Sequence, residues 1–295
     1  MRLDRAITLG IVKPFMRAVG SYSLGVTSSG CRSAMPILMY HSIAARDESS
    51  VHDYFKLSTP PSVFRTQMQT LKDCGYSGVD LNAALIWLKQ HGCWPEGKVV
   101  ITFDDGFRDF FDAALPVLSE FGFTSTMFLP SSLISEDRKS FKGVECMTWG
   151  EVREAQSKGT HLGAHTVTHP VLYTLSWSEI REELRGSKAQ IEQNLGRPAT
   201  TFAYPFAFPD ADTEFCVRLR ELLVSEGYEC CVTTNAGRAK FGDDLYSLKR
   251  LPMNGADDVE LLRSKLGGAY DWVNPAQRFV KRLRNVMNPL RKRLP

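Results

Sequence analysis

The sequence lacks a long apolar run. Near the N-terminus, the apolar residues 7–12 are interrupted by Lys13 and Pro14, and a membrane-spanning helix needs about 20 apolar residues. Lys13 breaks the apolar stretch and no clean cleavage site follows it, and both features argue against a secretory signal. We therefore expect a cytoplasmic chain, one that can also work peripherally at the inner membrane face.

The sequence also lacks any C-x-x-C pair, and its cysteines are odd in number. This pattern argues against a disulfide framework and against a cysteine zinc site. We expect most of the cysteines to be small buried apolar residues, as in a reducing compartment. The seven are Cys31, Cys74, Cys93, Cys146, Cys216, Cys230 and Cys231.

A strong excess of one charge is absent as well. Lys and Arg number 36 against 33 Asp and Glu, and 43% of the residues are apolar. This balance excludes a disordered chain and a dedicated nucleic-acid binder. A chain of 295 residues is also within the range of a single α/β barrel.

Positive charge does gather after Tyr270, where apolar residues interleave at helical spacing. We expect residues 271–295 to form a solvated basic helix and tail, or to attach weakly to anionic lipid or an acidic glycan. The basic residues are Arg278, Lys281, Arg282, Arg284, Arg291, Lys292 and Arg293.

Between these ends, apolar runs alternate with helical patterns about seven times without an internal repeat. The pattern predicts an α/β fold, a parallel sheet closed or nearly closed into a (β/α)7-type barrel with outer helices. We expect residues 1–34 to be an irregular leader and residues 35–270 to form the barrel domain. The predicted strands cover residues 36–41, 78–81, 99–103, 124–129, 162–165, 199–204, 229–233 and 246–251, and the predicted helices residues 62–75, 82–92, 109–120, 149–158, 176–195, 213–226 and 257–266.

Two adjacent carboxylates, Asp104 and Asp105, end the apolar run at residues 99–103 and precede Gly106. Reactive groups of such barrels lie at the carboxyl ends of the strands, where His41, His165 and Pro205 are also expected. One carboxylate can hold a metal while the other handles a proton. An ordinary Asp-Asp-Gly turn is the alternative.

His165 and His169 lie four residues apart, after Gly163 and Ala164. With one carboxylate they make a three-ligand set for a divalent metal that keeps an open position, as in hydrolytic sites. The second aspartate is then free to act as a base. A lone histidine pair of this kind can also be structural.

Together, Thr-Phe-Asp-Asp-Gly at residues 102–106 and His-Thr-Val-Thr-His at residues 165–169 resemble the polysaccharide deacetylase family, the NodB-like carbohydrate esterases. The resemblance covers about residues 35–255. It implies a distorted (β/α) barrel that removes N- or O-acetyl groups from sugars. Residues 37–41 and 202–206 resemble the branch that acts on exopolysaccharide such as poly-N-acetylglucosamine.

The resemblance also implies roles for these residues. Asp104 matches the general base, and Asp105, His165 and His169 match the metal ligands. Zinc is the default metal, although the ligand set also accepts cobalt, nickel or iron.

A third motif follows the predicted strand at residues 199–204. Pro205 and Phe206 match the segment whose backbone N–H helps to hold the oxyanion, with Tyr204 beside them as a substrate contact. This sequence departs from the family here, because the common arginine is replaced by Phe202-Ala203 and the usual glycine by Ala207.

Many relatives keep a general acid in a late Leu-His motif, and no histidine follows His169 here. In the exopolysaccharide branch the acid comes from the first strand, and His41 matches it. The alternative for His41 is a satisfied core histidine. Arg250 resembles an arginine that orients the base, Asp104.

Three functions are consistent with this sequence. The first is metal-dependent removal of N-acetyl groups from a polysaccharide or its precursor. The others are a catalytically silent glycan-binding homologue and a hydrolase of a small non-peptide amide. The expected partner is an N-acetylated glycan, with no nucleic acid; the sequence does not specify the sugar, N- versus O-deacetylation or the oligomeric state.

Overall fold

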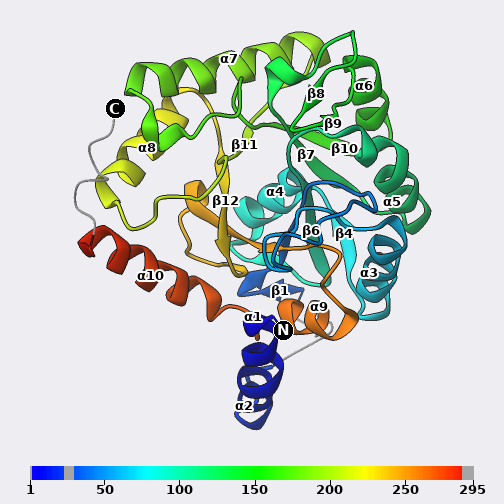
Figure 1. Cartoon of the computed structure of the whole chain (residues 1–295), viewed down its shortest axis with the longest axis vertical. Coiled ribbons are helices and arrows are strands. Elements are labelled where there is room, and N and C mark those ends of the chain that lie inside the picture. The colour runs from blue at the N-terminus through cyan, green and yellow to red at the C-terminus, as the bar shows by residue number, and fades with distance from the viewer. Residues whose placement is uncertain (1, 23–29, 288–295) are drawn as a thin grey trace.

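A closed barrel of seven parallel strands with outer helices forms the body of the molecule (Figure 1). The computed structural model describes residues 2–22 and 30–287. The predicted α/β barrel is confirmed. Its strands are β3 (Ile37–Tyr40), β6 (Lys98–Phe103), β7 (Ser125–Leu129), β10 (Thr160–Ala164), β11 (Thr201–Ala203), β12 (Cys230–Ala236) and β14 (Leu248–Pro252).

The barrel closes where the first strand meets the last. Leu38 of β3 pairs with Leu251 of β14, and the other edge of β3 pairs with β6. The barrel is distorted at β6, because two strands share one of its edges. β4 (Ser77–Val79) pairs with the first half of β6, and β7 pairs with its last residues, Thr102 and Phe103.

Side chains point alternately to the inside and the outside of the barrel, so they form two separate apolar clusters. Val100 of β6 belongs to the smaller cluster, with Phe128, Val232 and Leu248 of other barrel strands. Its neighbour Ile101 belongs to the larger cluster with residues of the outer helices. Since side chains alternate with a period of two, residues 100, 102 and 104 share the inner face of the barrel.

The outer helices begin and end close to the predicted positions. A capping box at Ser176 and Glu179 opens the helix that was predicted at residues 176–195. The helix that was predicted to begin at Asn82 begins at Leu81, because Asp80 caps it and accepts the bond from Ala83 N–H at 2.9 Å. The helices are α3 (Pro61–Asp73), α4 (Leu81–His91), η2 (Phe110–Ala114), α5 (Leu115–Phe121), α6 (Trp149–Ser157), α7 (Trp177–Leu195), α8 (Thr213–Ser225), α9 (Val259–Leu266) and α10 (Val273–Met287).

Short elements surround the barrel ends. Three antiparallel pairs are present among the described residues: β1 (Cys31–Arg32) with β5 (Trp94–Pro95), β2 (Ala34–Met35) with β13 (Ala239–Lys240), and β8 (Ser140–Phe141) with β9 (Val144–Glu145). The 3₁₀ turns are η3 (Ser131–Leu133), η4 (Leu172–Thr174) and η5 (Leu245–Ser247).

The expected irregular leader is wrong for residues 3–18, which are helical. They form α1 (Leu3–Ile7), η1 (Thr8–Val12) and α2 (Lys13–Ala18). Side-chain contacts with residues in and near α9 hold this segment. Contacts with residues so distant in the chain cannot be predicted from the local sequence. At the other end, α10 confirms a helix within residues 271–295, while Arg291, Lys292 and Arg293 lie outside the described residues. The proposed domain boundaries stay predictions.

Within the described residues, the helices are too short or too polar to span a bilayer.

One pair of cysteines forms a disulfide, although the sequence argued against a disulfide framework. Cys31 and Cys93 form a disulfide between β1 and the segment that leads into β5, while Cys146, Cys230 and Cys231 are free and buried. Disulfides persist in oxidising compartments. This pair therefore weighs against the reducing, cytoplasmic location that cysteine usage had indicated, and the location stays a prediction.

We expect Cys93→Ser to lower the free energy of unfolding by about 2–4 kcal/mol without reductant, because the disulfide closes a loop across 62 residues. Cys74→Ser, which changes a free cysteine, is the matched control. Denaturant titration of the three proteins measures the difference, and added dithiothreitol should bring the wild type to the level of Cys93→Ser. Equal stability of wild type and Cys93→Ser in the absence of reductant would contradict the structural role of the disulfide.

Candidate active site

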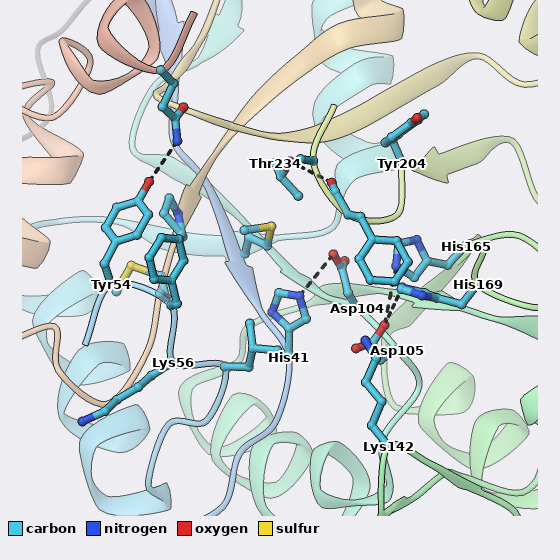
Figure 2. Close-up of a pocket in the computed structure, with 18 residues that line it drawn as sticks. His41, Tyr54, Lys56, Asp104, Asp105, Lys142, His165, His169, Tyr204 and Thr234 are labelled. Carbon is cyan, nitrogen blue, oxygen red and sulfur yellow. Dashed lines mark hydrogen bonds and ion pairs between the residues drawn. The ribbon is translucent and has the colours of Figure 1, made fainter. Parts of the chain in front are cut away.

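A cavity of about 360 Å³ opens at the carboxyl ends of the barrel strands. It collects side chains that follow β3, β6 and β10, which are the strand ends that the sequence singled out. Figure 2 shows these side chains converging on the cavity. They are His41, Asp104, Asp105, His165 and His169.

Asp105, His165 and His169 form a buried cluster whose possible ligand atoms lie within 4.8 Å of one another. Oδ1 of Asp105 is 3.2 Å from Nε2 of His169 and 3.6 Å from Nε2 of His165. Among the described residues, this buried oxygen accepts no hydrogen bond. A carboxylate oxygen left in this state indicates a missing positive partner.

The spacing of the cluster fits a divalent metal. Two ligands at about 2.0–2.1 Å from zinc and at the tetrahedral angle lie about 3.3 Å apart. The distances from Asp105 Oδ1 to the two imidazoles, 3.2 and 3.6 Å, bracket this value. The cluster can therefore hold a metal through one oxygen and two nitrogens.

The backbone of the cluster is strained. Asp105, Thr166 and His169 have φ angles of 74°, 69° and 59°, a left-handed conformation that non-glycine residues rarely adopt. Such strain costs on the order of 1–3 kcal/mol per residue and clusters at functional sites. Here it turns the Asp105 and His169 side chains toward the same point.

The loop that carries His169 is held by Glu183 of α7. The Glu183 carboxylate accepts bonds from the backbone N–H groups of Val167 and Thr168 at 2.7 and 2.9 Å. Thr166 Oγ1 then accepts from the His169 N–H at 3.0 Å. These bonds offset the strain and fix the loop.

The orientation of His165 is set by the next strand. Its Nδ1 lies 2.7 Å from the carbonyl oxygen of Ala203, so Nδ1–H donates and Nε2 faces the cluster with a free lone pair. Burial, together with the His169 ring, lowers the pKa of His165 to about 4 against the opposing pull of Asp104 and Asp105. The neutral imidazole is the form that binds metal.

Asp104 points into the barrel and forms a bidentate ion pair with Arg250 of β14. Both Arg250 terminal nitrogens donate to the Asp104 carboxylate at 2.7 Å. Burial alone would raise the pKa of Asp104, but the Arg250 guanidinium more than offsets it, and the pKa lies below its usual range. The predicted contact between Arg250 and Asp104 is therefore present, and it keeps the carboxylate ionised.

His41 lies beside Asp104 and lines the cavity (Figure 2). Its Nε2 is 3.9 Å from Asp104 Oδ2, and 16% of its side chain is exposed. The histidine therefore borders the cavity, as a general acid must, although its role stays a prediction.

The segment after β11 forms another part of the cavity wall. Tyr204 is buried and Phe206 is exposed, with a φ of 57° and its ring centroid 4.6 Å from that of His169. Thr234 Oγ1 donates to the Phe206 carbonyl at 2.9 Å and fixes the turn after the buried Pro205. The structure thus brings Tyr204 and Phe206 to the cavity, and their predicted roles remain untested.

One wall of the cavity could not be found from the sequence, where residues 131–146 read only as a polar connection. Lys142 and Gly143, both with positive φ, make the two-residue turn of the β8–β9 hairpin. The Lys142 ammonium lies 4.4 Å from the Phe141 ring centroid and 5.1 Å from that of Phe206. The only sequence signal for this wall was the glycine, which suits a tight hairpin turn.

The facing wall comes from the loop between β3 and α3. Tyr54 accepts a hydrogen bond at 2.9 Å from Gln277 of α10, and both residues line the cavity. Phe55 beside them is 67% exposed. Nothing in the local sequence indicated that α10 contributes to the site.

Comparison with known proteins agrees with this geometry. The family described as Polysaccharide deacetylase matches residues 91–223. The chain is 29% identical to YxkH of Bacillus subtilis over 74% of this chain and 70% of that protein. It is also 24% identical to the poly-beta-1,6-N-acetyl-D-glucosamine N-deacetylase of Staphylococcus aureus, over 56% of this chain and 59% of that protein.

A solved structure shares the fold. The Streptococcus pyogenes deacetylase PplD, determined in complex with acetate, superposes with a TM-score of 0.68 at 25% identity. The alignment covers 79% of this chain and 98% of PplD.

We expect Asp105→Ala, His165→Ala and His169→Ala each to lower bound metal and acetyl hydrolysis together. A catalytic metal supplies several kcal/mol, so the rate should fall at least about a hundredfold. Elemental analysis after dialysis measures the metal. His91→Ala, at the end of outer helix α4, is the control and should change neither quantity. Full metal content in all three cluster variants would refute the assignment of the ligands.

Proposed function

Because this chain belongs to the polysaccharide deacetylase family, we propose that it removes N-acetyl groups from an N-acetylated polysaccharide, with zinc at Asp105, His165 and His169. One observation carries the proposal. A three-ligand cluster and a separate ionised carboxylate, Asp104, face the same open cavity. A glycan-binding protein has no use for the second carboxylate.

The chain's own residues divide the work around the amide. A metal held by Asp105, His165 and His169 would supply Lewis acidity, which acidifies water and polarises the acetyl carbonyl. Asp104 accepts the proton of the attacking water. Its two oxygens offer about four lone-pair sites, of which Arg250 takes two, so the carboxylate keeps capacity for that proton.

His41 then protonates the departing amine. Its place on the cavity wall, 3.9 Å from Asp104, supports this role. We propose that the backbone N–H of Phe206 helps to hold the developing oxyanion, and the bond from Thr234 to the Phe206 carbonyl, which fixes this turn, supports that role. A donor of this kind is typically worth about 3 kcal/mol.

We propose a polymer of N-acetylglucosamine as the substrate. Phe55 and Phe206 stand exposed on facing walls, and aromatic rings of this kind pack against the apolar faces of sugar rings. The cavity is open at the rim, as a polymer requires. The similarity to the poly-beta-1,6-N-acetyl-D-glucosamine N-deacetylase of Staphylococcus aureus supports the same class.

Acetate release from a panel of substrates tests the proposal. The panel should hold β-1,6- and β-1,4-linked N-acetylglucosamine oligomers, an O-acetylated glycan and small acetamides. We expect the zinc-loaded enzyme to prefer the N-acetylated oligomers. Asp104→Asn should keep the metal and lose at least about 99% of turnover, because an amide cannot accept the water proton.

The other hypotheses make different predictions in this assay. Release from small acetamides alone would favour a small-amide hydrolase. Binding of the oligomers without any acetate release would favour a silent glycan-binding protein. Near wild-type turnover by Asp104→Asn would mean that Asp104 is not the base.

We expect His41→Ala to lower amide turnover at least about a hundredfold with metal content intact, because a general acid contributes about 10² to 10⁴ in rate. An activated ester such as 4-nitrophenyl acetate has a better leaving group, so its hydrolysis should fall much less. The ratio of the two rates is the measurement. An equal fall for both substrates, or no fall in either, would return His41 to a structural role.

A further inference from the structure

The N-terminal helical segment, residues 3–18, turns its polar side toward the protein and its apolar side toward solvent. Its polar and charged side chains face the protein: Asp4 is 9% exposed, Thr8 0% and Lys13 6%, as is Arg2 just before the segment at 6%. A helix on the surface of a soluble protein normally places its apolar stripe inward.

Tertiary ion pairs hold the segment in this orientation. Arg2 pairs with Asp257 at 2.9 Å, and Asp4 accepts a hydrogen bond from Tyr270 at 2.6 Å. One turn further, Trp272 Nε1 donates to Thr8 Oγ1 at 3.1 Å.

The second half of the segment is held by α9. Lys13 pairs with Glu260 at 3.2 Å. The inward face is therefore anchored along its length, and the helix cannot roll to bury its other side without breaking buried ion pairs.

The outward face carries a row of large apolar side chains at multiples of four residues, one face of a helix. This row, the N-terminal apolar row, consists of Leu3, Ile11, Phe15 and Val19, which are 68%, 65%, 66% and 54% exposed. Four such side chains held side by side in water indicate a surface that has an apolar partner.

Charge around the row identifies the partner. In residues 2–20, Arg2, Arg5 and Lys13 pair with acidic residues of the protein, and Arg17 is the exposed basic residue beside the row. On α10, which contains four basic residues and no acidic one, Arg278 is 47% exposed. On α10, Phe279 and Val280 are also exposed, at 63% and 45%. In Figure 1, α10 runs along the lower left side of the molecule, and α2 projects below the barrel. Apolar side chains flanked by cations are complementary to an anionic bilayer surface.

We propose that the N-terminal helix docks the protein on an anionic lipid bilayer, with the N-terminal apolar row inserted among the acyl chains and the exposed Arg17 and Arg278 on the headgroups. The segment is too short to span the bilayer, so it lies in the interface. The neighbouring α10 reaches the active site, because its Gln277 donates a hydrogen bond to Tyr54 in the cavity wall.

Vesicle flotation of the full-length protein tests the proposal. The vesicles contain either 30% phosphatidylglycerol in phosphatidylcholine or phosphatidylcholine alone. We expect the wild type to float with the anionic vesicles and more weakly with the neutral ones. The double variant Ile11→Ser/Phe15→Ser should lower the partition coefficient for anionic vesicles at least about tenfold. Its circular dichroism and its hydrolysis of a soluble substrate should stay unchanged.

The matched control is Val217→Ser/Val224→Ser, which removes two apolar side chains that are 52% and 48% exposed on α8. It should float like the wild type. Absence of wild-type flotation, equal flotation with both vesicles, or equal loss in both double variants would overturn the proposal. Light scattering that finds a wild-type dimer and a monomeric Ile11→Ser/Phe15→Ser would overturn it in favour of self-association.

Discussion

The buried ion pair between Arg250 and Asp104 is the interaction on which the active site depends. Removing a guanidinium from water costs several kcal/mol, and the cost is offset only where its donors are satisfied. Arg250 is 0% exposed and donates to Asp104, to Thr102 Oγ1 and to the Thr233 carbonyl. These bonds join β6, β12 and β14 across the barrel interior. The same bonds that hold the strands together therefore fix the Asp104 carboxylate beside the cluster of Asp105, His165 and His169.

The local part of this site could be predicted from the sequence. The motifs at residues 102–106 and 165–169 follow strands, and the carboxyl ends of parallel strands meet at one rim. Their side chains had to converge there if the barrel was assigned correctly. The contact of Arg250 with Asp104 was given by the family resemblance, and its reason lies in the inner face that residues 102 and 104 share on β6.

The rest could not be predicted, because it depends on contacts between segments far apart in the chain. The wall at Lys142 requires the β8–β9 hairpin to fold over His169, and the opposite wall requires Tyr54 to meet α10. Likewise, the helical segment at residues 3–18 is held in place because Arg2 pairs with Asp257, and Cys31 is oxidised because β1 pairs with the segment beside Cys93. In each case a residue's neighbours in the sequence do not predict its distant partner.

The closure of the barrel between β3 and β14 has a consequence for the protein's synthesis. β3 is the first barrel strand to leave the ribosome and β14 the last, and Leu38 pairs with Leu251. Translation at about 5–20 residues per second leaves one edge of β3 without its partner for tens of seconds. An unpaired apolar strand edge is a template for aggregation. Nascent chains of this protein therefore benefit from a chaperone that covers this edge until almost the whole barrel has been made.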